Sequence, residues 1–195
     1  ESRQILWIDY AQVQDKYEFV SKLADSNASL NYVLLDGFKS SYRFSTNQVR
    51  VINPPDSICR CFEYQPKISL PTDPYIRATL QAYAAQYHYL LQEREEATYE
   101  QALAGVIQAY QFTSDVLRAY QPHLTAIWNE FYPLSRVAQF ACDMMKAKTV
   151  YLEYGLLPGT IQIDCLGQVG ESWIARQPKE FHSLDIMPTD VQRAR

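Results

Sequence analysis

Apolar runs near the start of the chain predict buried strands. Residues 5–8 and residues 32–35 each form such a run, and the second is closed by an Asp-Gly turn signal. Between them, residues 16–23 carry apolar side chains at helical spacing. Strand, helix and strand in this order are typical of a parallel βαβ sheet. Residues 49–52 predict a third strand, stopped by two prolines.

The middle of the chain predicts two helices that pack as a hairpin. The first begins near Pro74, and its apolar positions recur three and four residues apart through residues 76–91. The second begins after Thr98, whose spacing from Gln101 fits a capping box. Its apolar stripe continues to Leu117. We interpret this hairpin as structural.

The alternation of strand and helix then returns. Residues 124–128 predict a strand, residues 134–145 a helix, and residues 149–152 a strand that ends on Glu153. We therefore predict a single α/β domain over residues 1–195, a Rossmann-like parallel sheet flanked by helices.

Composition and charge narrow the function classes. A net charge of −4 argues against nucleic acid as a partner, because phosphate binding needs a basic surface. No apolar run approaches the roughly 20 residues of a membrane span. The four cysteines predict reduced, structural thiols and a cytoplasmic compartment. The 15 tyrosines suit a carbohydrate- or partner-binding groove, or simply edge the core.

Polar side chains follow three of the predicted strands. Asp9, Asn129 and Glu153 each come directly after a buried run, and ligands of open parallel sheets bind outside the carboxyl ends of the strands. We expect all three at one edge. Asp9 is also the kind of residue that caps a helix or accepts loop hydrogen bonds. The amide of Asn129 could bind a sugar hydroxyl or hold a loop.

The segment after Glu153 is rich in glycine. Four of the six glycines fall between positions 155 and 170, and glycine lets the backbone approach a ligand closely. We expect a loop from Glu153 to Trp173, with Glu153 as a site acid held in low dielectric. The alternative is a long surface loop with ordinary turn glycines.

Several familiar motifs are missing from the sequence. It has no glycine-rich dinucleotide fingerprint, no phosphate loop with its lysine and no Gly-x-Ser-x-Gly elbow. The three histidines lack metal-ligand spacing, and no Asp-x-Asp pair is present. We expect no metal and no nucleotide cradle in this chain.

Two stretches resemble the capsule polysaccharide biosynthesis family. They are AIWN at 126–129 and, after a helix, VYLEYGLLPGTIQID at 150–164. The family motif is a WN pair followed by E-x-G-[FL]-[FL]-P-G-T-x-Q-x-D-x-x-G. The resemblance covers residues 126–172 and departs at Tyr154, where relatives more often carry Asn or Asp.

The resemblance implies a glycosyltransferase of surface polysaccharide, either capsule or lipopolysaccharide. The family includes bacterial transferases that move Kdo, an acidic eight-carbon sugar, from CMP-Kdo to a glycan with retention. They have a GT-B-like pair of Rossmann-type domains and need no metal. This chain would be the amino-terminal, acceptor-side half, with the nucleotide-binding half absent or beyond it.

The resemblance also assigns site residues. Glu153 would be a catalytic acid/base or a site-ordering carboxylate, and Asp164 is the only candidate nucleophile within the motif. The implied substrate-binding residues are Asn129, Tyr154, Gly155, Gly159 and Thr160.

Implied partners are a glycan acceptor and, through a second domain, a CMP-linked sugar donor. Nucleic acid is not among them. The resemblance also suggests peripheral association with the cytoplasmic face of the inner membrane or with other polysaccharide-assembly proteins. The main alternative is a non-catalytic glycan- or partner-binding module of the same fold. An epimerase-like enzyme is disfavoured by the missing glycine-rich turn.

Overall fold

A mixed six-stranded sheet forms the centre of the molecule. The computed structural model describes residues 3–10, 16–37, 42–93, 97–129, 131–155, 160–167, 172–177 and 179. The strands lie in the order β3-β2-β1-β4-β5-β6. Their bounds are β1 Arg3–Asp9, β2 Leu30–Asp36, β3 Val49–Ile52, β4 Leu124–Trp128, β5 Thr149–Tyr154 and β6 Ile161–Asp164.

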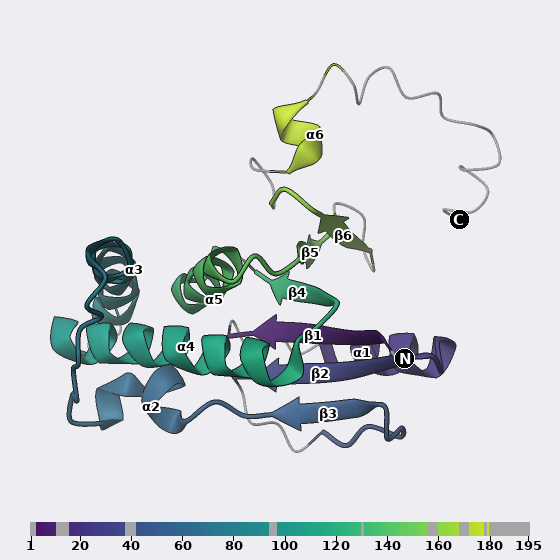
Figure 1. Cartoon of the computed structure of the whole chain (residues 1–195), viewed down its shortest axis with the longest axis horizontal. Coiled ribbons are helices and arrows are strands. Elements are labelled where there is room, and N and C mark those ends of the chain that lie inside the picture. The colour runs from purple at the N-terminus through teal and green to yellow at the C-terminus, as the bar shows by residue number, and fades with distance from the viewer. Residues whose placement is uncertain are drawn as a thin grey trace.

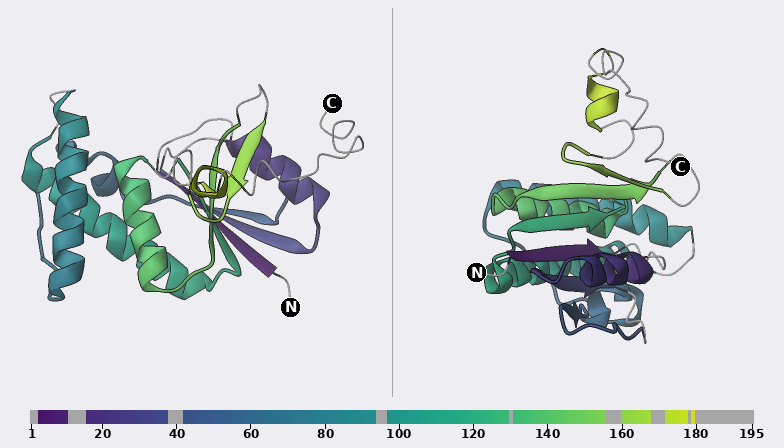
Figure 2. Two further views of the ribbon diagram at one scale, coloured as in Figure 1. Left: turned by 90° about the horizontal axis from the view of Figure 1, so that it is seen from above. Right: turned by 90° about the vertical axis from the view of Figure 1, so that its right-hand side faces the viewer.

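Helices lie in the connections β1–β2, β3–β4 and β4–β5, and one more follows β6. They are α1 Lys16–Ser26, α2 Asp56–Cys59, α3 Pro74–Gln92, α4 Tyr99–Tyr120, α5 Pro133–Met144 and α6 Trp173–Arg176, with a short 3₁₀ turn, η1, at Cys61–Glu63. Figures 1 and 2 show α3, α4 and α5 gathered on one face of the sheet and α1 on the other. This α/β arrangement is compatible with a Rossmann-like fold.

The predicted strands and helices are present. β1, β2, β4 and β5 contain the four runs expected to form the parallel sheet, and β3 spans the third predicted strand. Asp73 caps α3 by accepting hydrogen bonds from two backbone N–H groups. The Thr98–Gln101 capping box is formed at the start of α4. The sequence had not predicted α2 or η1.

The expected loop after Glu153 is partly wrong. β5 continues to Tyr154, and β6 pairs with it in the antiparallel direction. The sequence of β6 alternates apolar Ile161 and Ile163 with polar residues, which is the pattern of a half-buried strand. Residues 161–164 of the expected loop are therefore a strand, and the sheet is not wholly parallel.

The pleat of the sheet divides the core into two clusters. On the α1 face lie side chains such as Trp7, Leu34, Trp128 and Leu152. On the face covered by α3, α4 and α5 lie their sequence neighbours, including Ile8, Leu35, Ile127 and Tyr151. Alternate residues of each strand point to opposite faces, so consecutive residues belong to different clusters.

All four cysteines are free thiols, and Cys61 and Cys142 are buried, as expected for structural thiols. Burial, together with nearby carboxylates, raises the pKa of Cys59 to about 12. Burial likewise raises the pKa of Cys142 to about 12. Cys165 is exposed. Among the described residues, none of the helices combines the length and the apolar character needed to cross a membrane.

Candidate functional site

The carboxyl ends of the parallel strands bring the predicted polar residues to one edge. β1, β4 and β5 run parallel, so Asp9, Asn129 and Glu153 share this edge, as expected. The strand order reverses direction between β1 and β4, which is the topological switch point where open α/β sheets bind ligands.

The pleat separates these residues between the two faces. Tyr151 is in the cluster under α3, α4 and α5, so Glu153, two residues on, points to the same face. Asp164 pairs with Tyr151 across the antiparallel ladder and shares that face. Tyr154 pairs with Ile161 on the opposite, α1 face. The predicted catalytic carboxylates and Tyr154 are thus on different sides of the sheet.

A hollow of about 300 Å³ opens on the α1 face at this edge. Trp128, Tyr154 and Thr160, from the segment that the sequence singled out, form one of its walls. α1 supplies the opposite wall, which the sequence had not predicted. We call this cavity the aromatic hollow; its lining is Glu18, Phe19, Lys22, Trp128, Tyr154, Thr160 and Ile161.

A row of aromatic rings runs along the hollow and beneath it. Phe19 meets Trp7 edge-on with ring centroids 5.5 Å apart, and it meets Trp128 edge-on at 6.1 Å. Trp128 in turn meets the ring of Tyr154 at 5.8 Å. Trp128 is only 1% exposed, whereas Tyr154 is 50% exposed. The row therefore passes from the core to the surface.

The indole N–H of Trp128 has no hydrogen-bond partner within the described part of the chain. It is buried, and a buried donor left unpaired costs about 1–3 kcal/mol. Trp7 carries a second unpaired indole N–H but does not line the hollow. Trp128 therefore lines the hollow with a buried donor that lacks a partner among the described residues.

An ion pair on α1 stands at the mouth of the hollow. Lys22 Nζ lies 2.7 Å from Glu18 Oε1, and both side chains are 73% exposed. The hydrogen bond from Lys22 lowers the pKa of Glu18. The mouth therefore offers a charged donor and a carboxylate acceptor, which together suit the hydroxyl groups of a polar ligand.

The close packing around position 155 explains why this residue is glycine. Its N–H donates to the carbonyl of Thr160 at 2.8 Å, which closes the β5–β6 hairpin. A Cβ at this position would lie 2.1 Å from Oγ1 of Thr160. Only glycine lets Thr160 keep its place beside Tyr154. Gly159, the other glycine assigned to substrate binding, lies outside the described residues.

Asn129 occupies a left-handed backbone conformation, with φ of 51°. Its N–H donates to the carbonyl of Leu152 at 3.1 Å, and its carbonyl accepts from the N–H of Tyr132 at 3.2 Å. Asparagine is among the residues that tolerate this conformation best. Asn129 therefore joins the ends of β4 and β5 to the start of α5, directly beside Trp128.

The two predicted catalytic carboxylates both accept backbone hydrogen bonds. Glu153 is half-buried, and its Oε1 accepts from the N–H of Tyr154 at 3.0 Å. Asp164 accepts from the N–H of Leu166 at 2.7 Å and, with its other oxygen, from the N–H of Trp173 at 2.8 Å. Asp164 thus connects Leu166, just after β6, with Trp173 at the start of α6.

A buried ionic cluster occupies the other half of the same edge. Asp9 and Asp36 sit side by side at the ends of β1 and β2, and Lys16, at the start of α1, donates a hydrogen bond to each. Tyr17 donates from its hydroxyl to Asp36 at 2.7 Å. Burial opposes the charge on Lys16, but the two carboxylates outweigh burial and raise its pKa.

Sequence reasoning missed this cluster, although a signal was present. Two parallel strands that both end on aspartate place two carboxylates next to each other, and burial then demands a cation. Lys16 is the first basic residue after Asp9. The described residues hold no group of three or more His, Cys, Asp or Glu side chains that could bind a metal.

Comparisons with known proteins do not assign the chain. No protein-family model matches it, and no curated protein sequence matches it either.

Proposed function

We propose that this chain is the acceptor-binding half of a GT-B-like glycosyltransferase of surface polysaccharide assembly, of the Kdo-transferase type. The glycan acceptor binds in the aromatic hollow. A second domain binds the donor, CMP-Kdo, and transfer proceeds with retention and without a metal.

The aromatic hollow is the observation that carries this proposal. Sugar rings present C–H groups that pack on aromatic faces and hydroxyls that both donate and accept hydrogen bonds. The hollow supplies the exposed ring of Tyr154, the unpaired N–H of Trp128 and the Glu18–Lys22 pair. Its volume of about 300 Å³ is at the lower end of the range for small-ligand sites.

Glu153 is the proposed catalytic acid/base. Its side chain lies on the face opposite Tyr154, so this role requires a glycan that fills the hollow and extends around the end of β5 to the other face. A positioned acid or base contributes about 10² to 10⁴ in rate. In the same proposal, Asp164 orders the segment around the site through its backbone hydrogen bonds.

The test is sugar transfer from CMP-Kdo to capsule or lipopolysaccharide oligosaccharides by the protein together with its donor-binding half. Glu153→Gln should reduce transfer by at least about 10² while leaving the thermal midpoint nearly unchanged. Glu100→Gln, an exposed glutamate in the first turn of α4, is the matched control and should retain normal transfer. Normal transfer by Glu153→Gln at an unchanged midpoint removes Glu153 from the mechanism.

A second candidate is a non-catalytic glycan-binding module. It is favoured by the position of Glu153 and Asp164 on the face away from the hollow and by their hydrogen bonds to backbone N–H groups. This candidate predicts that the chain binds a glycan but that no sugar is transferred to it from any donor. The transferase predicts in addition that the chain alone does not bind CMP tightly. Micromolar CMP binding in calorimetry would show that the donor site lies within these residues.

A further inference from the structure

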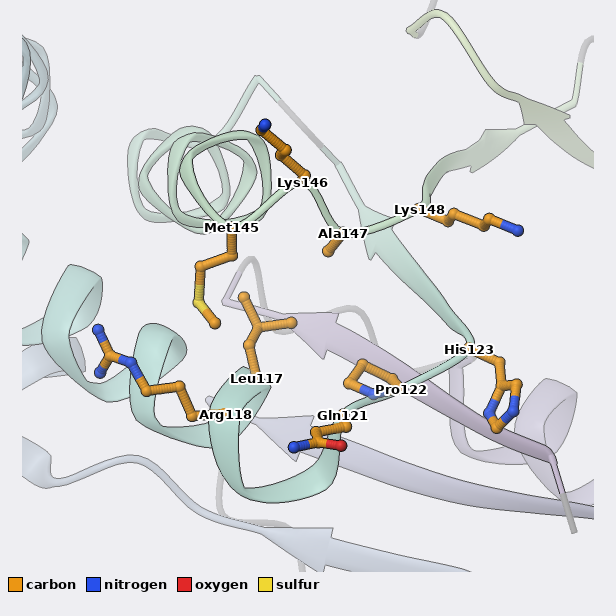
Figure 3. Close-up of a pocket in the computed structure, with 9 residues that line it drawn as sticks. All are labelled: Leu117, Arg118, Gln121, Pro122, His123, Met145, Lys146, Ala147 and Lys148. Atoms are coloured by element: carbon orange, nitrogen blue, oxygen red, sulfur yellow. The ribbon is translucent and has the colours of Figure 1, made fainter. Parts of the chain in front are cut away.

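A larger hollow lies at the amino edge of the sheet, opposite the candidate site. Its volume is about 520 Å³, and it forms where the end of α4 meets the connection from α5 to β5 (Figure 3). Two segments distant in sequence contribute its lining, which consists of Leu117, Arg118, Gln121, Pro122, His123, Met145, Lys146, Ala147 and Lys148. We call it the basic hollow.

The basic hollow has an apolar floor and a cationic rim. Figure 3 shows Leu117 and Met145 pointing toward one another, with Pro122 and Ala147 beside them. The charged ends of Lys146 and Lys148 extend outward from the margin. All of the cationic side chains on the rim are exposed, whereas Leu117 belongs to the core.

The polar side chains of the lining are mainly donors, and no carboxylate is among them. Lys146 and Lys148 form no ion pair with any described residue, while Arg118 pairs with the exposed Asp115 at 2.7 Å. His123 accepts a hydrogen bond at Nδ1 from the N–H of Gln4, so its neutral ring carries the proton on Nε2 and offers a donor there. In a chain of net charge −4, this is a local concentration of positive charge.

Favourable interactions with the helix dipoles explain only some of these basic side chains. Basic side chains near the carboxyl end of a helix complement its dipole, which accounts for Arg118 on α4 and Lys146 after α5. His123 and Lys148 lie in the connections to β4 and β5, outside either helix. The helix dipoles also do not account for the hollow between the two segments.

We propose that the basic hollow binds an organic phosphate ester whose apolar part rests on the floor and whose phosphate meets the rim. A phosphate group only accepts hydrogen bonds from such donors, and Lys and Arg are its usual partners. The volume of the hollow falls within the range of small-ligand sites. Because the floor is apolar, the ester carries an apolar group and is not a nucleotide such as CMP: it is either a soluble phosphomonoester of this kind or the headgroup of an anionic lipid.

The first experiment is calorimetric titration of the whole chain with hexyl phosphate, which combines one phosphate with one apolar group. Inorganic phosphate tests charge alone, and hexanol tests the apolar floor alone. We expect hexyl phosphate to bind at least about tenfold more tightly than either. Equal affinity for hexyl phosphate and inorganic phosphate overturns the proposal, because the floor would then contribute nothing.

Charge removal tests the position of the site. In one variant, Lys148→Gln is combined with Lys146→Asn, since asparagine tolerates the left-handed φ of 55° at position 146. A control variant, Arg43→Gln with Lys67→Gln, removes the same charge from exposed positions elsewhere. The rim variant should lose hexyl phosphate affinity by at least about tenfold, and the control should keep it. Equal affinities in the two variants overturn the proposal, and matching thermal midpoints confirm that both are folded.

A vesicle arm distinguishes the two sources of the ester. If the ester is a lipid headgroup, the protein should sediment with phosphatidylglycerol vesicles but not with phosphatidylcholine vesicles. The rim variant should not sediment with either. Hexyl phosphate binding without vesicle binding identifies a soluble phosphomonoester. Vesicle binding that survives in the rim variant contradicts a lipid headgroup in this hollow.

Discussion

The edge of the sheet at the carboxyl ends of the parallel strands has two halves, both covered by α1. They differ in whether their buried polar groups have partners. At the ends of β1 and β2, Asp9 and Asp36 are joined by Lys16. At the ends of β4 and β5, Trp128 keeps an unpaired N–H and Tyr154 remains half exposed. The first half is sealed, whereas the second contains the aromatic hollow.

The difference does not come from strand position. Asp36, Asp9 and Trp128 occupy neighbouring places in one row across the α1 face, since Ile8 pairs with Ile127 and the next residues follow in register. It comes from α1, which delivers Lys16 to the carboxylates and, three residues later, borders the hollow with Phe19. A buried polar group that finds its partner inside the chain stabilises the fold. One that lacks a partner costs stability until an acceptor reaches it.

The largest expected effect concerns the sealed half. Lys16→Met leaves Asp9 and Asp36 buried without their cation, and breaking a buried ion pair in this way costs about 3–5 kcal/mol. Urea unfolding measures the loss. Lys22→Met is the control on the same helix; it breaks only an exposed pair and should change the free energy of unfolding by about 0.5 kcal/mol or less.

The pH dependence of that loss has a definite sign. The pKa of Lys16 is raised in the folded state, so its contribution is complete below the unfolded value of about 10.4 and declines as pH rises through the folded value. The difference between wild type and Lys16→Met should therefore persist from pH 7 to about pH 10 and fall only above it. A difference that disappears by pH 8 contradicts a charged Lys16 between the two carboxylates.

The next largest expected effect is a difference in thiol reactivity between Cys59 and Cys165. Burial and the carboxylates of Asp56, Asp36 and Asp9 raise the pKa of Cys59 to about 12, which leaves almost no thiolate at pH 8. Cys165 lies exposed beyond β6. A disulfide reagent should label Cys165 at least about a hundredfold faster than Cys59, as followed by peptide mass mapping. Comparable rates would show that the sealed half opens readily.

A smaller effect is expected at the hairpin that borders the hollow. Gly155→Ala places a Cβ against Oγ1 of Thr160, and overpacking of this kind costs about 1–3 kcal/mol. Thr160→Gly in the same chain removes the clash and should recover most of the loss in urea unfolding. If Gly155→Ala alone is neutral, the hairpin does not hold Thr160 as described.

The elements of the fold followed from local patterns, because each signal depends on residues close in sequence. The apolar runs predicted β1, β2, β4 and β5, and the capping box predicted the start of α4. β6 was missed because four residues after a glycine-rich stretch of sequence give only a weak alternation of apolar and polar residues. α2 is equally short and depends on packing against α4.

The site was predicted only in part, for two physical reasons. We placed Glu153 and Tyr154 in one site because they are adjacent in sequence. Consecutive residues of a strand point to opposite faces, so the two side chains lie on different sides of the sheet. The α1 wall of the aromatic hollow depends on how a helix docks against the sheet, which no local pattern encodes. Trp128 and Thr160 were in the right segment, and their partner Phe19 came from more than a hundred residues earlier in the chain.

The smallest expected change is also the most direct test of the central proposal, that a sugar occupies the aromatic hollow. The chain has three tryptophans, so its ¹H–¹⁵N spectrum shows three indole N–H signals, which Trp7→Phe and Trp128→Phe assign. Titration with capsule or lipopolysaccharide oligosaccharides should shift the Trp128 signal downfield as its N–H acquires an acceptor, and should leave the Trp7 signal in place. Trp128→Phe should weaken binding about tenfold, equivalent to about 1.4 kcal/mol, and Trp7→Phe should not. Saccharide binding that leaves the Trp128 signal unmoved, or that weakens equally in both variants, contradicts a glycan site in this hollow.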